Sequence, residues 1–315
     1  MFEMKNVVAL VVTYNRKKLL KESIDSLLGQ SYPLSNIIVI DNNSSDGTED
    51  LFRSGEYCGR LNIEYHKMEK NIGGAGGFHN GFEIAMRNKN FDFLWIMDDD
   101  VIPERDALEK LLFDTDELDN NGVDFSYLAS TVFGLNNEIM NVPQILSSAE
   151  REGIYPDWNR FLEFGLVKIE VATFVSLLIK RKAIDKVGLP IKDYFIWGDD
   201  TEYTQRLNKY YGRAFLSGNS KVLHKRKMAE TLSLWKEKDK ARMKMYIHYF
   251  RNNLLNVYKY KSPRSSVRMI INYNIEAFKN LRNPNWFYKW KIMQRSIWQY
   301  IKINKKKYFD FTKNI

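Results

Sequence analysis

The chain has 315 residues, 44% of them hydrophobic and 28% charged, which is the composition of a globular protein able to bury a core. Its single cysteine, Cys58, excludes a disulfide framework and a multi-cysteine zinc site, and it fits a reducing compartment. The apolar runs at residues 7–12 and 171–179 are far shorter than the ~20 residues of a transmembrane helix. We therefore expect neither a signal peptide nor a membrane span.

The net charge of +9 is unevenly distributed along the chain. Residues 225–315 contain 23 Lys and Arg against 5 Asp and Glu, whereas residues 1–224 contain 25 against 34. An asymmetry of this size indicates two regions with different surfaces.

In the first hundred residues, short β-branched runs alternate with stretches of helical spacing. The runs expected to form strands are residues 7–12, 37–41, 61–65 and 91–97, and the expected helices are residues 16–30, 46–52 and 75–87. Continuous apolar runs are typical of strands buried on both faces. This alternation predicts an α/β fold with a mostly parallel sheet and helices on both of its faces.

The pattern is less regular after residue 100. We expect helices at residues 103–112, 181–187 and 200–210, and strands at residues 125–132, 168–179 and 214–223. Beyond residue 225 the sequence becomes helical, basic and aromatic, so we place a boundary between residues 1–225 and residues 226–315.

Three adjacent carboxylates, Asp98, Asp99 and Asp100, directly follow the strand expected at residues 91–97. Like charges repel, so this run at the end of a buried strand needs a compensating cation. Ligands bind at the carboxyl ends of strands in open α/β sheets, and Mg²⁺ and Mn²⁺ prefer carboxylate oxygens. The alternative is an exposed acidic turn that caps the next helix.

A glycine-rich segment precedes the helix expected at residues 75–87. It contains Asn71, Gly73, Gly74, Gly76 and Gly77. Glycines allow the backbone to approach a phosphate closely, and the start of a helix attracts anions. The segment matches neither the dinucleotide fingerprint nor the Walker loop. A purely structural turn is the alternative.

A second acidic pair, Asp199 and Asp200, follows Trp197 and opens the helix expected at residues 200–210. The helix dipole favours acids at this position, so capping would explain one of them. Capping alone does not explain the second acid or the tryptophan. The pair is therefore a candidate for acid–base chemistry.

Ordered segments of the first 224 residues resemble the family 2 glycosyltransferases, which have the GT-A fold. Residues 11–16 (VVTYNR) and 39–48 (VIDNNSSDGT) are similar to that family's first two nucleotide-binding segments, and the DDD run is similar to its D-x-D signature. The resemblance implies that Asp98 and Asp100 hold a metal and that Asp41 accepts a hydrogen bond from a uracil or thymine base. It further assigns to donor binding Thr13, Tyr14, Asn15, Arg16, Asp99, Trp197 and the glycine-rich segment.

The glycine-rich segment most resembles the bacterial galactofuranosyltransferase branch, which implies UDP-galactofuranose as the donor. In that branch a histidine at the position of His224 completes the metal site, with Mn²⁺ or Mg²⁺ as the cofactor. The resemblance makes Asp200 the catalytic base for inverting transfer, with Asp199 orienting the acceptor. Gly198 separates the tryptophan from the acid pair, where some relatives place an acid directly, so the roles of Asp199 and Asp200 stay open.

The carboxyl-terminal region, residues 226–315, interleaves Trp286, Trp290 and Trp298 with Lys and Arg. Basic amphipathic helices with aromatic residues are typical of proteins that bind an anionic membrane surface. A helical packing or homo-oligomerisation module is the main alternative, and nucleic acid is the least favoured partner.

Together these features predict an inverting, metal-dependent glycosyltransferase that moves a sugar from a UDP-sugar to a lipid-linked oligosaccharide in cell-surface polysaccharide synthesis. We expect residues 1–225 to be the GT-A catalytic domain and the protein to be cytoplasmic, peripheral on the inner face of the cell membrane. A rhamnosyl- or other hexosyltransferase is the alternative within the fold. A nucleotidyltransferase or a non-catalytic glycan-binding protein is disfavoured by the missing basic loop after the first strand and by the intact acids.

Overall fold

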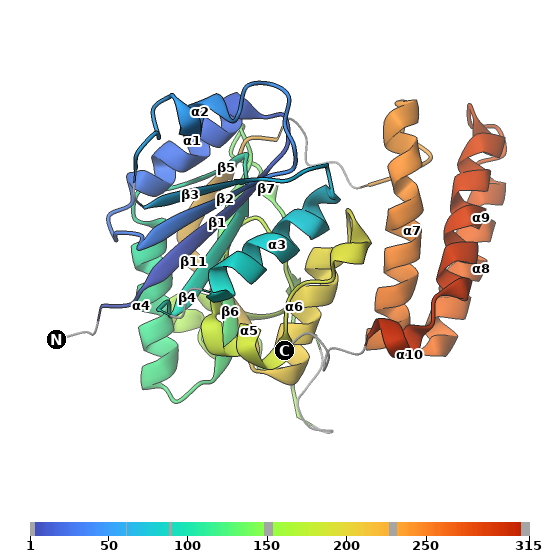
Figure 1. Ribbon diagram of the computed structural model, residues 1–315. Helices are drawn as coiled ribbons and strands as arrows, with labels where there is room; N and C mark the ends of the chain where they lie inside the picture. Colours follow the sequence, from blue (N-terminus) through green and yellow to red (C-terminus); the bar gives the residue numbers. More distant parts are fainter. Residues whose placement is uncertain (1–3, 61, 88–89, 148–153, 227–231, 310–315) are drawn as a thin grey trace.

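The computed structural model describes residues 4–60, 62–87, 90–147, 154–226 and 232–309. Its first part alternates strands and helices as expected (Figure 1). The strands are β1 (Val7–Thr13), β2 (Asn36–Asp41), β3 (Ile63–Lys67) and β4 (Phe93–Asp98), and the helices are α1 (Lys17–Leu28), α2 (Asp50–Arg53) and α3 (Gly73–Arg87). These four strands are parallel to one another, in the order β3-β2-β1-β4.

The second part extends the same sheet in the order β10-β6-β11-β9-β8. Its elements are β5 (Val101–Pro103), α4 (Ala107–Asn120), β6 (Phe125–Phe133), β7 (Ile139–Met140), β8 (Gln144–Ile145), β9 (Leu166–Val171), β10 (Leu177–Lys180), α5 (Arg181–Val187), α6 (Asp199–Tyr210) and β11 (Arg213–His224). Strand β10 is antiparallel to both of its neighbours, while β6 and β11 are parallel. The result is the expected GT-A-like sheet, parallel from β3 to β4 and mixed from β10 to β8.

Both faces of the sheet are covered, as the continuous apolar strands require. Alternate residues of β1 point to opposite faces: Val7, Ala9 and Val11 pack with α1 and α4, whereas Val8 and Leu10 pack with α3, α5 and α6. Every residue of β1 is buried. The central strands are therefore fixed from both sides.

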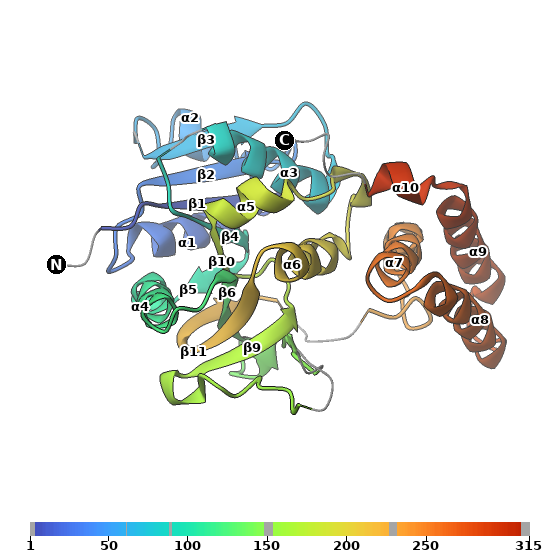
Figure 2. The same cartoon turned by 90° about the horizontal axis from the view of Figure 1, so that it is seen from below.

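The remaining helices form a separate layer beside α6, which is visible in Figure 1 and again in Figure 2. They are α7 (Lys240–Tyr260), α8 (Pro263–Lys279), α9 (Trp286–Lys302) and the single turn α10 (Lys305–Tyr308). Their shared core includes Met243, Phe250, Leu254, Met293 and Ile297. No helix within the described ranges combines the length and apolar character needed to cross a bilayer.

The helix expected at residues 46–52 begins only at Asp50. Two further expected elements differ from the structure because of strand pairing. The strand expected at residues 168–179 is two strands, β9 and β10, which lie at separate positions in the sheet and not in one line. The helix expected at residues 103–112 starts later, because Pro103 belongs to β5 and pairs with Val222 of β11. In both cases long-range pairing overrides the local pattern.

Candidate active site

The parallel strands bring the first sequence motifs to one edge of the sheet. Val12 of β1 is in register with Asp98 of β4, and Thr13 with Asp41 of β2, so all three strands end together. Thr13 Oγ1 then donates a hydrogen bond of 2.6 Å to Asp99 Oδ2. The carboxyl edge thus gathers the acidic run and both nucleotide-binding segments predicted from the sequence.

The candidate metal site lies at this edge. One ligand atom from each of Asp98, Asp100 and His224 lies within 4.8 Å of the others. His224 reaches the acids because β11 pairs antiparallel with β5, placing His224 opposite Val101. His224 Nε2 is 3.1 Å from Asp100 Oδ1.

The orientation of His224 is fixed by a residue that the sequence analysis missed. His224 Nδ1 is 2.9 Å from Asn141 Oδ1, and Asn141 Nδ2 in turn donates to Thr173 Oγ1. When Nδ1 gives its proton to Asn141, Nε2 is held facing Asp100. Support of this kind orients metal-binding histidines in proteins.

The raised pKa values in the acidic run indicate that a cation is needed there to offset the negative charge. Burial, together with the charges of Asp100 and Asp99, raises the pKa of Asp98 well above its usual value. Burial also raises the pKa of Asp99 to about 6. Asp100 Oδ1 is buried and faces His224 Nε2 at 3.1 Å, without a hydrogen bond of normal geometry among the described residues. A set of carboxylate oxygens with one imidazole fits Mn²⁺ or Mg²⁺.

The guanidinium of Arg16 offsets part of the negative charge of the acidic run. Its Nη1 lies 2.5 Å from Asp100 Oδ2 and 3.1 Å from Asp99 Oδ1. Burial alone would raise the pKa of Asp100, but His224 and Arg16 bring it below the usual value. Asp100 is therefore ionised, as a metal ligand must be.

The nucleotide-binding segments are tied to each other. Asn15 has a φ of 53°, its backbone N–H donates to Ser44 Oγ, and its Oδ1 accepts from Ser45 N. Tyr14 is exposed beside it. Asp41 is fully buried, and its two oxygens already accept from Ser44 N and Tyr65 Oη. Recognition of a base by Asp41 therefore stays a prediction.

The glycines at the start of α3 differ in what surrounds them. A Cβ at Gly73, Gly76 or Gly77 would lie under 3 Å from Phe195, Ile72 or Val12, respectively. A Cβ at Gly74 would meet nothing within 4 Å. Asn71 Oδ1 accepts from Gly73 N and so shapes the turn into the helix. Most of these glycines allow close packing, and Gly74 is the one of the four that opens onto free space.

The second acidic pair opens α6, next to Gly198 with a φ of 91°. Asp199 is buried, whereas Asp200 is half-buried and accepts from Thr201 N at 2.6 Å. Burial and the charge of Asp200 raise the pKa of Asp199 to about 7, and burial also raises the pKa of Asp200. The charge of Asp199 contributes to the raised pKa of Asp98, so the acid pair lies within electrostatic reach of the metal candidates.

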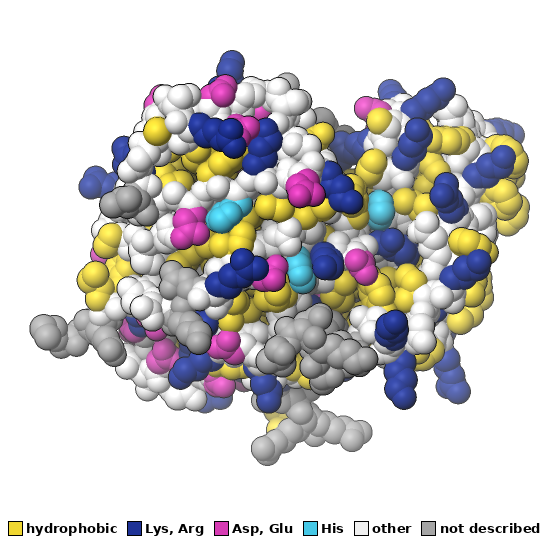
Figure 3. Space-filling view, in the orientation of Figure 1, with side chains coloured by type: hydrophobic (Ala, Val, Ile, Leu, Met, Phe, Trp, Pro, Cys, Tyr) yellow, Lys and Arg dark blue, Asp and Glu magenta, His cyan; other side chains and the backbone are white. Residues whose placement is uncertain are grey.

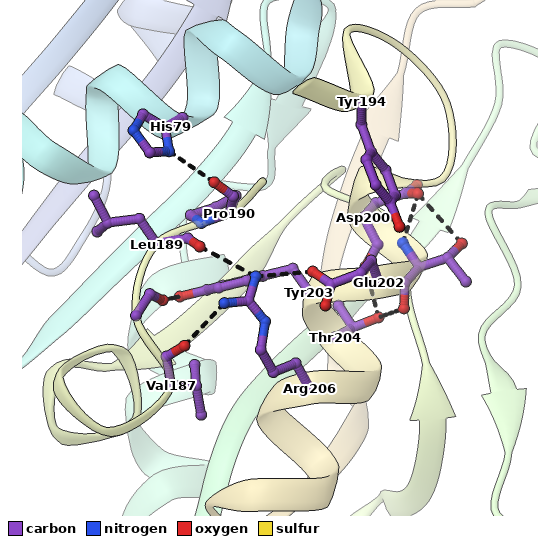
Figure 4. Close-up of polar contacts among 12 residues, drawn as sticks. His79, Val187, Leu189, Pro190, Tyr194, Asp200, Glu202, Tyr203, Thr204 and Arg206 are labelled. Carbon is purple, nitrogen blue, oxygen red and sulfur yellow. Dashed lines mark hydrogen bonds and ion pairs between the residues drawn. The ribbon is translucent and has the colours of Figure 1, made fainter. Parts of the chain in front are cut away.

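Helix α6 is anchored by a buried ion pair behind this site (Figure 4). Arg206 Nη2 lies 2.8 Å from Glu202 Oε2, and Arg206 also donates to the carbonyls of Val187 and Leu189. Tyr260 Oη of α7 donates to the other oxygen of Glu202. The helix that presents the acids is thus locked to the sheet layer and to α7.

Comparison with known proteins identifies the family. The sequence model described as Glycosyl transferase family 2 matches residues 8–188, more than half of the chain. The chain belongs to glycosyl transferase family 2. The matched region runs from β1 to α5 and includes the acidic run and both nucleotide-binding segments.

Its curated relatives include enzymes named galactofuranosyltransferase GlfT1. That of Mycobacterium tuberculosis is 35% identical over 211 residues, covering 64% of this chain and 64% of the relative, and that of Mycolicibacterium smegmatis is 26% identical, covering 64% and 65%. Glycosyltransferase AglE of Haloferax volcanii is 26% identical, covering 64% and 60%. The matched region therefore spans less than two-thirds of these relatives' own length.

Solved structures agree with the fold. S. aureus TarS, residues 1–349, superposes with a TM-score of 0.52 at 15% identity, covering 96% of this chain and 73% of that chain. GalNAc-T7 with UDP, GalNAc and Mn²⁺ gives a TM-score of 0.55 at 14% identity, covering 79% and 51%. At this identity the likeness shows the fold alone, which agrees with the expected GT-A-like sheet.

Proposed function

We propose that this enzyme transfers galactofuranose from UDP-galactofuranose, with inversion, to a lipid-linked glycan acceptor in cell-surface polysaccharide synthesis. The observation that carries the proposal is the meeting of Asp98, Asp100 and His224 at the edge where the nucleotide-binding strands end. The relatives named galactofuranosyltransferase support the choice of donor. UDP and UDP-sugar complexes are known for S. aureus TarS, which has this fold.

Each candidate site residue would have its own role in the transfer reaction. Asp98, Asp100 and His224 would hold a divalent cation, whose charge would stabilise the leaving UDP. Arg16 lies beside Asp100 and would add positive charge near the donor phosphates. Asp200, which is half-buried, would take the proton from the attacking acceptor hydroxyl, while buried Asp199 would orient the acceptor.

The test is a panel of nucleotide sugars offered to the purified protein with Mn²⁺. We expect UDP release from UDP-galactofuranose, loss of that release with EDTA, and recovery when Mn²⁺ is restored. Preference for a different nucleotide sugar would replace the donor assignment. Equal activity with and without EDTA would overturn the metal site.

A rhamnosyl- or other hexosyltransferase remains the second candidate. Relatives and structures of this fold include enzymes named for N-acetylglucosamine transfer, such as TarS. The metal and base chemistry would be the same, so the donor panel separates the two candidates.

We also propose that the enzyme is peripheral on the cytoplasmic face of the membrane, bound through the outer face of α8 and α9. Exposed apolar side chains form a stripe along one face of each helix. Their spacings are three, four or eleven residues, which return to the same face of a helix. They are Val267, Ile271, Ile275 and Phe278 on α8, and Phe287, Trp298 and Ile301 on α9. We call these seven residues and the basic side chains between them the α8–α9 face.

The charge of the α8–α9 face suits anionic lipid. From residue 263 to residue 309 the sequence has 11 Lys and Arg and one acidic residue, Glu276. Lys and Arg side chains stand among hydrophobic ones over these helices in Figure 3. A second copy docked through the same face would bring like charges together, whereas anionic headgroups would neutralise them.

A further inference from the structure

The turn Tyr194–Gly198, which leads into the acidic pair, has a strained backbone. Phe195 has φ 63° and ψ −60°, and Ile196 N donates to Tyr194 O at 2.7 Å. This is the rare form of the γ-turn, disfavoured for any residue with a side chain. Trp197 follows with φ 61°. Two bulky residues with positive φ within three positions persist only where the surroundings hold them.

Two asparagines of α7 hold this turn. Asn252 is fully buried, and its Nδ2 lies 3.0, 3.1 and 2.7 Å from the carbonyl oxygens of Tyr194, Ile196 and Trp197. Asn256 donates to Gly198 O at 2.9 Å and accepts from Tyr194 Oη at 2.7 Å. One side chain that binds three carbonyls of a single turn fixes its shape directly.

The turn is confined on its other side by α3. Ala75 N donates to Phe195 O at 3.1 Å, and a Cβ at Gly73 would lie only 2.1 Å from that oxygen. Glycine at position 73 is therefore required for the turn to pack here. The turn sits between the glycine-rich start of α3 and the asparagines of α7.

We infer that Asn252 and Asn256 are positioning residues for the transfer reaction: through the turn Tyr194–Gly198 they hold Trp197 and the acidic pair in the reactive arrangement. Helix α7 then belongs to the catalytic unit, although it lies beyond residue 225 and outside the matched family region. The inference rests on the proposed function in one respect, because the role of the acidic pair in transfer is taken from that proposal. Neither asparagine approaches the acceptor chemistry itself, since their amides are committed to the turn.

Asn252→Asp is the sharpest variant, because it replaces an amide donor by a carboxylate that repels the three carbonyls. Asn256→Ala is the milder variant and removes the bond to Gly198. Asn274→Ala is the matched control, since Asn274 of α8 bonds to Gln294 and to Ile270 O, away from the turn. All are made in the full-length chain, with Mn²⁺ and the nucleotide sugar that the wild-type enzyme prefers.

We expect kcat to fall by about 10²-fold in Asn252→Asp and by about 10-fold in Asn256→Ala, as for misplaced catalytic groups. The Kd for UDP, measured by calorimetry with Mn²⁺, should change far less than kcat, because the asparagines do not touch Asp98, Asp100 or His224 and reach α3 only through the turn. Asn274→Ala should match the wild type in both.

Unchanged kcat in a variant that still binds UDP would overturn the positioning role. Parallel loss of UDP binding, kcat and Tm in both asparagine variants would also overturn it and leave a purely structural role. Because the donor is chosen by experiment, rejection of UDP-galactofuranose would refute the donor assignment and leave this test intact.

Discussion

Asn141 shows how one amide outside every motif can tune the candidate metal site. It contacts His224 Nδ1 and is itself held by Thr173. We expect Asn141→Ala to lower the affinity for Mn²⁺ by about 10- to 100-fold, as for other residues that orient a metal-binding histidine. Calorimetric titration of Mn²⁺ in the presence of UDP measures this directly.

Asn136→Ala is the control for that measurement, because Asn136 lies in the same hairpin and is exposed, with its backbone bonded to Glu138. Asp100→Ala, which removes a proposed ligand, should abolish Mn²⁺ binding. Equal Mn²⁺ affinity in Asn141→Ala and the wild type would show that Asn141 does not orient His224 for binding the ion.

The acidic pair at the start of α6 should give transfer a pH dependence near neutrality. Burial and the charge of Asp200 raise the pKa of Asp199 to about 7, and burial raises that of Asp200. The base must be deprotonated, so kcat/KM should fall as the pH drops through the raised pKa of Asp200, and ionisation of Asp199 should add a second change near pH 7. Asp199→Asn removes the group with the pKa of about 7, so only the limb set by Asp200 should remain.

Rates measured between about pH 5 and pH 9 test this expectation. Asp200→Asn should lower kcat by about 10²- to 10⁴-fold while UDP binding survives. If Asp199→Asn has that effect and Asp200→Asn stays active, Asp199 is the base.

The acidic residues of the candidate site could be selected from the sequence because each stands in a compact local pattern. Asp98 and Asp100 follow an apolar strand, and Asp199 and Asp200 open a helix. Asn141 and Asn252 have no such signal: each acts through a contact with a segment more than 50 residues away. Only the fold brings these partners together.

At the scale of elements, α3 contains glycines with two different duties. A Cβ at Gly81 would lie 2.3 Å from Leu10 Cδ1, whereas one at Gly74 would meet open space. We expect Gly81→Ala to lower the free energy of unfolding by about 1–3 kcal/mol through overpacking, with UDP affinity kept in the folded fraction. Gly74→Ala should keep the stability and weaken UDP binding, because its methyl group enters the space proposed for the phosphates.

Urea denaturation measures the free energy of unfolding of both variants, and calorimetry measures their affinity for UDP. Together they separate the packing role from the donor-binding role. Full UDP affinity in Gly74→Ala would show that this glycine does not face the donor. The sequence predicted a phosphate contact for all four glycines from Gly73 to Gly77. It could not reveal that a Cβ on three of them would clash with Phe195 O, Ile72 or Val12, because these contacts depend on how the chain packs around the start of α3.

The order of elements in the parallel half was predictable, since buried strands and amphipathic helices alternate there. The interruption between β9 and β10 was not. The sequence predicts one strand over residues 168–179, yet β10 pairs with β4 and β6 while β9 pairs with β11. Apolar character indicates burial, but it does not say which neighbour a strand will find.

For the whole molecule, the α8–α9 face predicts binding to anionic vesicles that weakens with salt. Exposed Arg268, Lys279, Lys291 and Arg295 line this face. Reversing all four to Glu should remove most of the binding, at about 1 kcal/mol for each cation near the surface. Flotation with vesicles that contain phosphatidylglycerol, at low and high salt, measures the effect.

Lys70, Lys182 and Lys186 provide the control, because they are exposed on the sheet layer and their reversal to Glu should leave vesicle binding unchanged. Lys305 is unsuitable for such a test, since it donates to Tyr300 O and so supports the fold. Undiminished flotation of the fourfold variant would exclude the α8–α9 face. Absence of flotation by the wild-type chain would leave these helices a packing or oligomerisation role.

The hydrogen bond from Ala75 N to Phe195 O has a consequence for the order of substrate binding. It joins the helix proposed to face the donor phosphates to the turn that carries the acids of the acceptor side. A nucleotide sugar that orders the start of α3 when it binds would also order that turn, and such coupling between two sites is reciprocal. We therefore expect compulsory order, with the donor binding first and UDP leaving last. UDP should inhibit competitively against the nucleotide sugar and non-competitively against the acceptor, and competition with both would indicate random entry.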